Sequence, residues 1–303
     1  RARFVLEVVQ AVREAVGPAF PVWIRISADE AIWGGYDLDF MRRLAPKLVA
    51  AGADALHVSV GVYSTPGNLS IASMDTPPGF NLFRARALRE VAGVPVIGVG
   101  RIRRPEEADR AIAAGDADLI SFGRQHLTDP EFLLKTLEGR PDDIRWCTGC
   151  NQGCIERLGL EMKSTTCTFN PECGQEYRGE ATPVAGLRRL WVIGAGPAGL
   201  SAALAAAGRG WRVEVFEAAD APGGQLRSAA RPPHKEAFLD WVNWAVRQLE
   251  RRGVRLRLAK NVDAEALRRE RPDAVILAAG ASPLVPPIPG IGGANVADAR
   301  DVL

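Results

Sequence analysis

The sequence has little of what marks a membrane, secreted or nucleic-acid-binding protein. Its 38 Lys and Arg nearly balance 36 Asp and Glu, so there is no basic excess to attract nucleic acid or an anionic membrane. It has no run of 18 apolar residues, and its opening stretch RARFVLEVVQAV lacks the cleavage site of a signal peptide. We therefore expect small-molecule partners, no membrane span and no export; the composition is compatible with a monomer or an oligomer.

Length and composition predict a globular protein of about two domains. With 303 residues and 47% hydrophobic content, the chain can bury a sizeable core. Its five cysteines include a closely spaced set, and thiolates survive best in a reducing compartment. We therefore expect a cytoplasmic protein.

Four of the cysteines follow the pattern C-x2-C-x3-C-x12-C, at Cys147, Cys150, Cys154 and Cys167. Four thiolates on a short segment form a soft, roughly tetrahedral ligand set, which suits an iron-sulfur cluster or Zn²⁺. Zinc sites usually pair two C-x2-C knuckles, whereas three close cysteines with a distant fourth are more typical of cubane clusters. The spacing therefore favours a [4Fe-4S] cluster, with zinc as the alternative.

Burial in a core is the other explanation for these thiols. Three of them lie in WCTGCNQGC, among Thr, Gly, Asn and Gln, outside any apolar periodic pattern that would bury them. The fifth, Cys173 in NPECGQE, could be a spare ligand, but we expect an ordinary thiol there. The metal or cluster hypothesis is thus preferred for the other four.

Before the cysteines, strand-like and helix-like segments alternate. Each of four predicted strands is followed by a helix, and Pro105 and Pro130 are expected to open the last two helices. The strands are VWIRIS, ALHVSV, VPVIGVG and DLISFG, and the earlier helices are Phe4–Val16, Phe40–Ala51 and Arg84–Val91.

Such units build an α/β fold with a parallel sheet. We interpret them as the C-terminal half of a (β/α)₈ barrel, with a four-stranded open sheet as the alternative. Four units are half of a barrel, and the chain opens inside a helix without an initiating Met, so we expect a fragment.

Two strand ends carry a glycine followed by an arginine: Gly100-Arg101 after VIGV and Gly123-Arg124 after LISF. Loops after the last strands of a barrel commonly form a phosphate site, where glycine allows close backbone approach and arginine supplies a bidentate cation. We therefore predict that these pairs bind the phosphate of FMN. Ordinary turns with surface charges are the alternative.

Arg25 stands inside the apolar strand VWIRIS, so its charge needs a polar environment or an acidic partner. Near a flavin it would stabilise negative charge on the reduced ring. The alternative is a structural salt bridge with Asp29 or Glu30.

After a linker over residues 177–187, the segment LWVIGAGPAGLSAALAAAGRGWRVEVFE contains a dinucleotide fingerprint. A predicted strand leads through a glycine-rich turn into an Ala-rich helix, and Glu217 ends the next strand. Glycines there let pyrophosphate approach the helix N-terminus, and the acid binds ribose hydroxyls. The three glycines are Gly194, Gly196 and Gly199.

Two further motifs favour FAD in this domain. Gly223-Gly224-Gln225 adds a second flexible backbone segment, which is typical of FAD-binding folds. DAVILAAG predicts a strand that ends at Gly280, where a side chain would collide with the cofactor; a simple strand-end turn is the alternative.

These motifs together resemble one family of flavoenzymes. They are similar to the iron-sulfur flavoproteins of the 2,4-dienoyl-CoA reductase and trimethylamine dehydrogenase group, within the old yellow enzyme superfamily. The stretches that carry the resemblance are CTGCNQGCIERL with CTFNPE, the upstream GVGRI and ISFGR, and the downstream VIGAGPAGLSAAL with PGGQL. The resemblance covers essentially the whole chain. It implies an FMN in a (β/α)₈ barrel, a [4Fe-4S] cluster, and a glutathione-reductase-like region that binds FAD, or ADP in amine dehydrogenases, and accepts NAD(P)H.

The resemblance also implies roles for individual residues and a domain order. The FMN contacts would be Arg25, Gly100, Arg101, Gly123 and Arg124. The cluster ligands would be Cys147, Cys150, Cys154 and Cys167. The FAD contacts would be Gly194, Gly196, Gly199, Glu217, Gly224, Gln225 and Gly280. The barrel half would occupy residues 1–140, the cluster segment and linker 141–186, and an incomplete Rossmann-like FAD/NAD(P) domain 187–303.

The sequence differs from the family where dienoyl-CoA reductases place a histidine, after the strand ALHVSV. Val62-Tyr63-Ser64 stand there instead. Tyr63 could donate the substrate proton, because a phenol is a competent general acid, or it could pack against flavin or substrate. We expect His57, in the preceding strand, to be a hydrogen-bonded core histidine.

The resemblance implies an NAD(P)H-dependent reductase of activated C=C bonds, such as enoates or 2,4-dienoyl-CoA thioesters, with electrons passing from NAD(P)H through FAD and the cluster to FMN. The alternative is an amine dehydrogenase or N-demethylase of the trimethylamine dehydrogenase type, for which Tyr63 and Trp33 are candidates to cage an ammonium group. A further alternative is a zinc-stapled binding module without catalysis.

Overall fold

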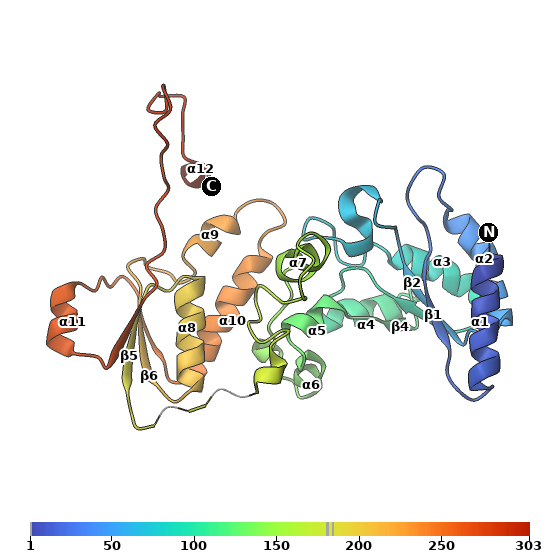
Figure 1. The fold of residues 1–303 in the computed structure, drawn as a ribbon, viewed down its shortest axis with the longest axis horizontal. Helices are drawn as coiled ribbons and strands as arrows, with labels where there is room; N and C mark the ends of the chain where they lie inside the picture. Colours follow the sequence, from blue (N-terminus) through green and yellow to red (C-terminus); the bar gives the residue numbers. More distant parts are fainter. Residues whose placement is uncertain (1, 180–181, 184) are drawn as a thin grey trace. The chain divides into compact units, whose positions relative to one another are not determined.

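The computed structural model describes residues 2–179, 182–183 and 185–303, in two compact units (Figure 1). The first unit contains the chain up to Pro130 and the segment Gly149–Asn170, and the second contains Glu131–Thr148 and Pro171–Leu303. The chain therefore passes from one unit to the other after Pro130, Thr148 and Asn170. The expected division at residues 140 and 186 partitions the chain differently and stays a prediction.

Four strands of the first unit form one parallel sheet in the order β1-β2-β3-β4. They are β1 (Trp23–Ser27), β2 (Ala55–Ser59), β3 (Val96–Gly98) and β4 (Leu119–Ile120). In a (β/α)₈ barrel the spatial order follows the chain order, whereas a doubly wound sheet reverses its order at a switch point. The observed order therefore favours the barrel interpretation over a doubly wound open sheet.

Helices follow the strands much as the sequence predicts. Asp37 caps one of them by accepting a hydrogen bond from the backbone N–H of Phe40 at 2.8 Å, and Pro105 opens another, as expected. The helices of this unit are α1 (Arg3–Val16), α2 (Leu38–Ala50), α3 (Leu82–Ala92), α4 (Pro105–Ala113), α5 (Arg124–Thr128), α7 (Arg157–Gly159), the 3₁₀-helix η1 (Pro66–Ile71) and the π-helix η3 (Gln152–Glu156).

One helix start differs from the expectation. Pro130 does not open a helix: α6 (Phe132–Leu137) begins after Glu131, and it belongs to the second unit. A separate short helix, α5, follows Gly123 directly. Its polar sequence RQHLT carries too little apolar periodicity to reveal it.

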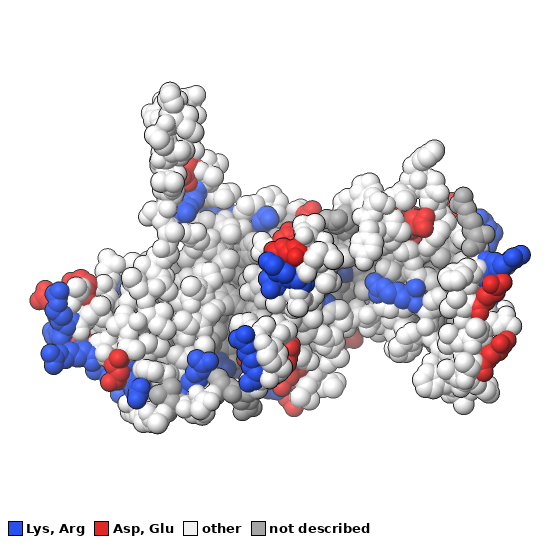
Figure 2. Space-filling view, viewed as in Figure 1, with Lys and Arg blue, Asp and Glu red and all other residues white. Residues whose placement is uncertain are grey.

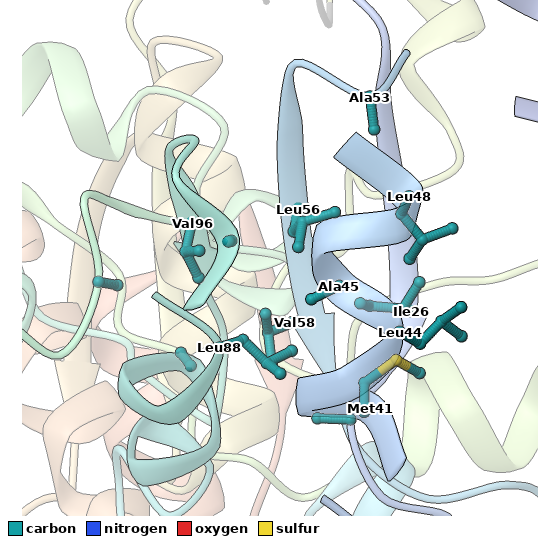
Figure 3. Close-up of a cluster of buried hydrophobic side chains, with 14 of the residues drawn as sticks. Ile26, Met41, Leu44, Ala45, Leu48, Ala53, Leu56, Val58, Leu88 and Val96 are labelled. Carbon is teal, nitrogen blue, oxygen red and sulfur yellow. The ribbon is translucent and has the colours of Figure 1, made fainter. Parts of the chain in front are cut away.

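The core of the first unit lies between the sheet and helices α2 and α3 (Figure 3). Leu56 and Val58 of β2 are fully buried there, as are Leu48 of α2 and Leu88 of α3. Burying an aliphatic side chain of this size contributes about 1.5–3 kcal/mol. Successive strand residues point to opposite faces, so the polar residues between these apolar ones fall on the other face of the sheet.

The second unit contains a parallel sheet in the order β7-β6-β5-β8, with the Ala-rich helix α8 packed on β5 and β6. Leu200 and Ala203 of α8 are fully buried against Val192 and Val215 of the sheet. The elements are β5 (Arg189–Ile193), α8 (Pro197–Gly208), β6 (Arg212–Phe216), α9 (Gln225–Ala229), α10 (Ala237–Arg251), β7 (Arg255–Arg257), α11 (Ala264–Glu270), β8 (Ala274–Leu277), α12 (Ala299–Val302) and the 3₁₀-helix η4 (Glu176–Arg178).

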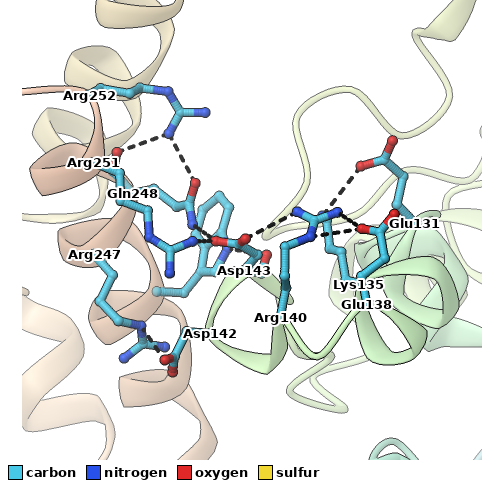
Figure 4. A network of polar contacts seen from close by, with 11 residues as sticks. Glu131, Lys135, Glu138, Arg140, Asp142, Asp143, Arg247, Gln248, Arg251 and Arg252 are labelled. Atoms are coloured by element: carbon cyan, nitrogen blue, oxygen red, sulfur yellow. Dashed lines mark hydrogen bonds and ion pairs between the residues drawn. The ribbon is translucent and has the colours of Figure 1, made fainter.

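The segment that precedes the cysteines packs against helix α10. The carboxylate of Asp143, in η2 (Pro141–Asp143), forms ion pairs with Arg251 and Arg140 and accepts a hydrogen bond from Gln248 at 2.9 Å (Figure 4). The indole N–H of Trp244 donates to the Asp143 carbonyl at 2.9 Å. Residues 131–148 are therefore packed as part of the second unit.

Surface charges of both signs are interspersed on the face shown in Figure 2, and basic side chains gather over α11, which contains Arg268 and Arg269. Within the described residues, the structure contains no helix whose length and apolar character would let it cross a membrane.

Candidate functional site

A polar row runs across the face of the first sheet that is opposite its core. Arg25 of β1 and His57 of β2 are direct partners in the parallel register. The Arg25 guanidinium lies 2.8 Å from His57 Nε2 through Nη1 and donates to Ser59 Oγ at 3.1 Å through Nη2. Ser27 anchors the same end of the sheet by donating to the Gly61 carbonyl at 2.7 Å.

The folded protein lowers the pKa of both titratable residues of this row, Arg25 and His57. Burial lowers the pKa of Arg25, and burial together with the Arg25 charge lowers the pKa of His57 from 6.5 to about 4. The imidazole is therefore neutral near pH 7, while the guanidinium keeps its charge. His57 is hydrogen-bonded, as expected, but it is not a core histidine, because it lies on the face opposite the core and is only partly buried.

The two acids proposed as alternative partners of Arg25 have other partners. Asp29 forms an ion pair with Arg84 at 2.9 Å and also accepts from the backbone of Ala31. The Glu30 carboxylate accepts from the backbone N–H of Tyr36 at 3.2 Å. The contacts found for Arg25 are those with His57 and Ser59, so its charge is oriented without being neutralised by a carboxylate.

The pair Gly100-Arg101 lies against Asn81. A Cβ on Gly100 would stand 3.1 Å from both the Cβ and the backbone nitrogen of Asn81, so a larger residue there would fit only if Asn81 shifted slightly. Arg101 has a left-handed backbone, with φ of +57°, and its guanidinium donates to the Thr76 carbonyl. Its side chain is therefore bonded to a neighbouring loop, and its contact with the FMN phosphate stays a prediction.

Asn81 was not predicted from the sequence. Its position at the start of α3 suggests a helix cap, but its buried side-chain amide instead donates to the carbonyls of Val58 and Val99, at 3.0 and 3.1 Å. It thus joins the ends of β2 and β3 where the loop with Gly100 begins.

The pair Gly123-Arg124 begins α5. Space is open where a Cβ of Gly123 would stand, so a ligand could approach this backbone. Arg124 donates a hydrogen bond to the side-chain oxygen of Asn151, which lies between two of the cysteines. The amide nitrogen of Asn151 in turn donates to the Ile71 carbonyl at 2.9 Å, so Arg124 and the cysteine segment are joined through one buried amide.

The segment with Cys150, Cys154 and Cys167 is folded back on itself in the first unit. A Cβ on Gly153 would stand 2.6 Å from the backbone nitrogen of Thr168, and Thr166 donates from its N–H to the Gly153 carbonyl at 2.8 Å. Cys167 lies 3.5 Å from the Thr128 hydroxyl. Glycine at 153 therefore allows the chain around Cys167 to lie directly against the segment around Cys154.

The thiols are the donors that iron-sulfur clusters use, and none of the five cysteines, all of which the structure describes, is in a disulfide. Among the described residues, however, no group of three or more His, Cys, Asp or Glu side chains is arranged to hold a metal ion. Cys147 belongs to the second unit, and its role stays a prediction from spacing. Cys173 is buried, in agreement with an ordinary thiol, and a metal role for it is untested.

Tyr63 and Trp33 are fully exposed on the loops that follow β2 and β1. Thr65 joins the two loops: its hydroxyl donates to the Glu30 carbonyl at 2.8 Å and accepts from the N–H of Val62 at 2.7 Å. The structure therefore leaves both aromatic side chains open to a ligand, and a catalytic role of Tyr63 stays a prediction.

In the second unit, two glycines of the glycine-rich turn leave no room for a side chain, whereas Gly196 between them has space for a Cβ. A Cβ on Gly194, whose φ is +106°, would overlap the carbonyl oxygen of Ala278, and one on Gly199 would overlap the carbonyl oxygen of Gly194. Gly224 approaches Gly196 closely, since its Cβ would stand 3.0 Å from the Gly196 Cα. The turn, the second glycine motif and the end of β8 thus meet at the N-terminus of α8, which suits a pyrophosphate.

The remaining predicted FAD contacts surround this turn. The Glu217 carboxylate accepts from the backbone N–H groups of Ala195 and Ala219, at 2.7 and 2.9 Å, and retains further lone pairs for hydroxyls. Gln225 donates to the Ala281 carbonyl at 3.0 Å, beside Gly280, whose φ is +79°. These residues fit a dinucleotide at this edge of the sheet.

Comparisons with known proteins agree with both units. Residues 1–143 match the NADH:flavin oxidoreductase / NADH oxidase family, and residues 192–252 match the NAD(P)-binding Rossmann-like domain. The chain is 39% identical over 307 residues to NADH oxidase of Thermoanaerobacter brockii, across 100% of this chain and 47% of that protein. It is 37% identical to N,N-dimethylglycine/sarcosine dehydrogenase of Chromohalobacter salexigens, across 96% of this chain and 43% of that protein.

A solved structure is similar over nearly the whole chain. The 2-naphthoyl-CoA reductase in complex with 2-naphthoyl-CoA has a TM-score of 0.90 and 30% identity, across 97% of this chain and 44% of that one. The chain therefore spans about half the length of the relatives it matches.

The match over the first sheet and the dinucleotide turn of the second unit together define the class as flavin oxidoreductases. Residues 1–143 belong to the NADH:flavin oxidoreductase / NADH oxidase family, and the relatives of the chain lie in the old yellow enzyme and trimethylamine dehydrogenase group.

Proposed function

We propose that the intact protein is an NAD(P)H-dependent flavin oxidoreductase that reduces activated C=C bonds in enoate-like or thioester substrates. Electrons would pass from NAD(P)H to FAD, a [4Fe-4S] cluster, FMN and then substrate. The observation that carries the proposal is the presence in one chain of an oriented, uncompensated Arg25 on the inner face of the sheet and a dinucleotide turn at Gly194. FMN would supply hydride transfer when bound; the protein supplies position and charge.

The residues of the first unit would bind and orient the flavin. Arg25 would face the ring and favour its negatively charged reduced form, and the open backbone at Gly123 would admit the phosphate near Arg124. Tyr63, exposed on its loop, would hold the proton for the substrate carbon opposite the hydride. The cluster proposal rests on the cysteine spacing and on the family, and a reducing cytoplasm would preserve it.

An amine dehydrogenase is the second candidate. The 37% identity to an N,N-dimethylglycine/sarcosine dehydrogenase favours it, and the exposed rings of Trp33 and Tyr63 could cage an ammonium group. In that case electrons would leave the flavin rather than arrive from NAD(P)H.

One preparation distinguishes these candidates. The intact protein is purified without oxygen, and its visible spectrum, iron, acid-labile sulfide, zinc and released flavins are measured. About four irons with FMN and FAD in each chain would support the reductase, and NAD(P)H-dependent reduction of enoyl compounds would then be assayed. FMN with ADP would favour the amine dehydrogenase, and zinc without flavin would contradict both.

A further inference from the structure

The partner of Arg25 is the imidazole of His57, and because this ring is neutral it leaves the positive charge of Arg25 in place. A guanidinium can only donate hydrogen bonds, and Arg25 Nη1 lies 2.8 Å from Nε2 and 3.5 Å from Nδ1 of His57. A neutral ring offers a lone pair to this cation, whereas an imidazolium offers none. The lowered pKa of His57 agrees with this protonation state at pH 7.

Within the described strands, the register neighbours of this pair are apolar. The register aligns Arg25 and His57 with Ile97 of β3 and Leu119 of β4, so the row continues with apolar side chains. Among the strand residues that point to this face, Arg25 and His57 are the titratable ones. The nearby acids Asp29 and Glu30 have the partners described above. Within the part of the chain that the structure describes, the positive charge of Arg25 is therefore not compensated by a carboxylate.

Two neutral contacts also determine the direction of that charge. His57 holds one terminal nitrogen of the guanidinium and Ser59 holds the other, and both residues lie on the neighbouring strand two positions apart. A carboxylate in place of His57 would hold Arg25 equally well but would cancel most of its field. Neutral acceptors fix the orientation and preserve the charge.

We propose that His57 is a positioning residue, which holds Arg25 as an oriented and uncompensated cation toward the negative charge that reduction places on the flavin. The inference rests on the proposed function, because it assumes FMN on this face of the sheet. It adds that the neutral imidazole sets how strongly the protein favours the reduced flavin, although His57 itself does not act on the substrate.

Three variants of the intact protein separate the effects of charge and orientation. His57→Gln keeps a neutral acceptor, His57→Leu removes the acceptor, and His57→Glu adds a compensating charge. The FMN midpoint potential is measured by redox titration at pH 7. We expect His57→Glu to lower the equilibrium constant for reduction at least tenfold, which is about 30 mV for a two-electron couple. His57→Leu should lower it several-fold, and His57→Gln should leave it within about twofold.

The control is His234→Glu, which makes the same substitution at an exposed turn of the second unit and should leave the potential unchanged. An FMN potential that is the same in His57→Glu and the parent protein would overturn the inference. If His57 has only a structural role, His57→Leu and His57→Glu should lower the stability of the protein without changing the FMN midpoint potential.

The protonation state of His57 can be tested without flavin. Nitrogen NMR of the ¹⁵N-His-labelled protein should show a neutral imidazole for His57 at pH 7, with the His57 signal assigned by its loss in His57→Gln. An imidazolium would overturn the inference. A protein that shows the neutral imidazole but binds no FMN would contradict the proposed function, and with it the role of His57; FMN binding with an unshifted potential in the variants would contradict the role of His57 alone.

Discussion

Arg124 donates a hydrogen bond to the side chain of Asn151, and so the helix that begins at Gly123 and the segment of the cysteines share a buried polar contact. Asn151 has a left-handed backbone, with φ of +62°, and its carbonyl accepts from Ile155 at 2.9 Å in the π-helix that contains Cys154. Asn151 thus links Arg124, a predicted ligand of the flavin phosphate, with the segment that carries the predicted cluster ligands Cys150 and Cys154.

Replacing Asn151 by glycine keeps the left-handed backbone and removes this amide. We expect Asn151→Gly to lower the free energy of unfolding by about 1–3 kcal/mol, because Arg124 and the Ile71 carbonyl each lose a buried partner. Iron content per chain should fall as well. Urea denaturation and iron analysis measure both effects. Gln10→Ala, which removes an exposed hydrogen bond of α1, should change stability by less than about 0.5 kcal/mol.

Asn81→Leu should destabilise the first unit by about 2–4 kcal/mol, since the carbonyls of Val58 and Val99 would both lose their donor in a buried setting. Chemical denaturation provides the measurement. The matched control is Asn243→Leu on the exposed side of α10, expected within about 0.5 kcal/mol of the parent. Equal effects of the two substitutions would show that the Asn81 amide contributes nothing particular.

Alanine in the glycine-rich turn should abolish FAD binding. In Gly199→Ala the new methyl group would overlap the Gly194 carbonyl, so the turn cannot keep its shape. Flavin released from the purified protein measures the loss. Gly208→Ala, at the other end of the same helix, has open space around its Cβ and should be neutral or up to about 1 kcal/mol stabilising. Retention of FAD in Gly199→Ala would contradict the assignment of this turn.

Because of His57, the free energy of unfolding should decrease as pH is lowered from about 6.5 to about 4. The pKa of its imidazole is lowered from 6.5 to about 4 in the folded protein, so the unfolded chain binds a proton first as pH falls. After discounting for partial exposure, the loss is about 1 kcal/mol. In His57→Gln this part of the pH dependence should disappear, as measured by urea denaturation at pH 7 and pH 4.5. A parallel decline in parent and variant would assign the effect to other groups.

The segment before the cysteines depends on Asp143. We expect Asp143→Ala to destabilise the second unit by about 1–3 kcal/mol, because the carboxylate is mostly buried and contacts Arg251, Arg140 and Gln248 (Figure 4). Its neighbour Asp142 is mostly exposed and lies 3.7 Å from Arg247, so Asp142→Ala should cost less than about 0.5 kcal/mol. Thermal unfolding of both variants tests the difference.

Patterns within short stretches of sequence predicted most elements of the first unit and the glycine-rich turn of the second, but not α10, β7 or α11. The alternation of apolar strands and amphipathic helices indicated a parallel α/β fold, and the helices near residues 40–51 and 84–91 were found within two residues of the expected positions. The Gly194 turn was predicted because its glycines act within six residues of one another. Helix α5 was missed, since five polar residues show no period.

Contacts between distant segments could not be predicted in this way. The sequence offered Asp29 or Glu30 as partners for Arg25 because they are close along the chain. The structure pairs Arg25 with His57 instead, since the register of β1 and β2 places them side by side. Asn81 and Asn151 resemble a helix cap and a turn residue in the sequence, and only the folded chain shows what their amides bind.

The sequence by itself determined the kinds of chemistry present in this protein: thiols at cluster spacing, cations at strand ends and a glycine turn for a dinucleotide. These depend on residue type and local spacing. Only the tertiary structure decided which charges are compensated, because that depends on which side chains the strand register and the packed loops bring within hydrogen-bonding distance.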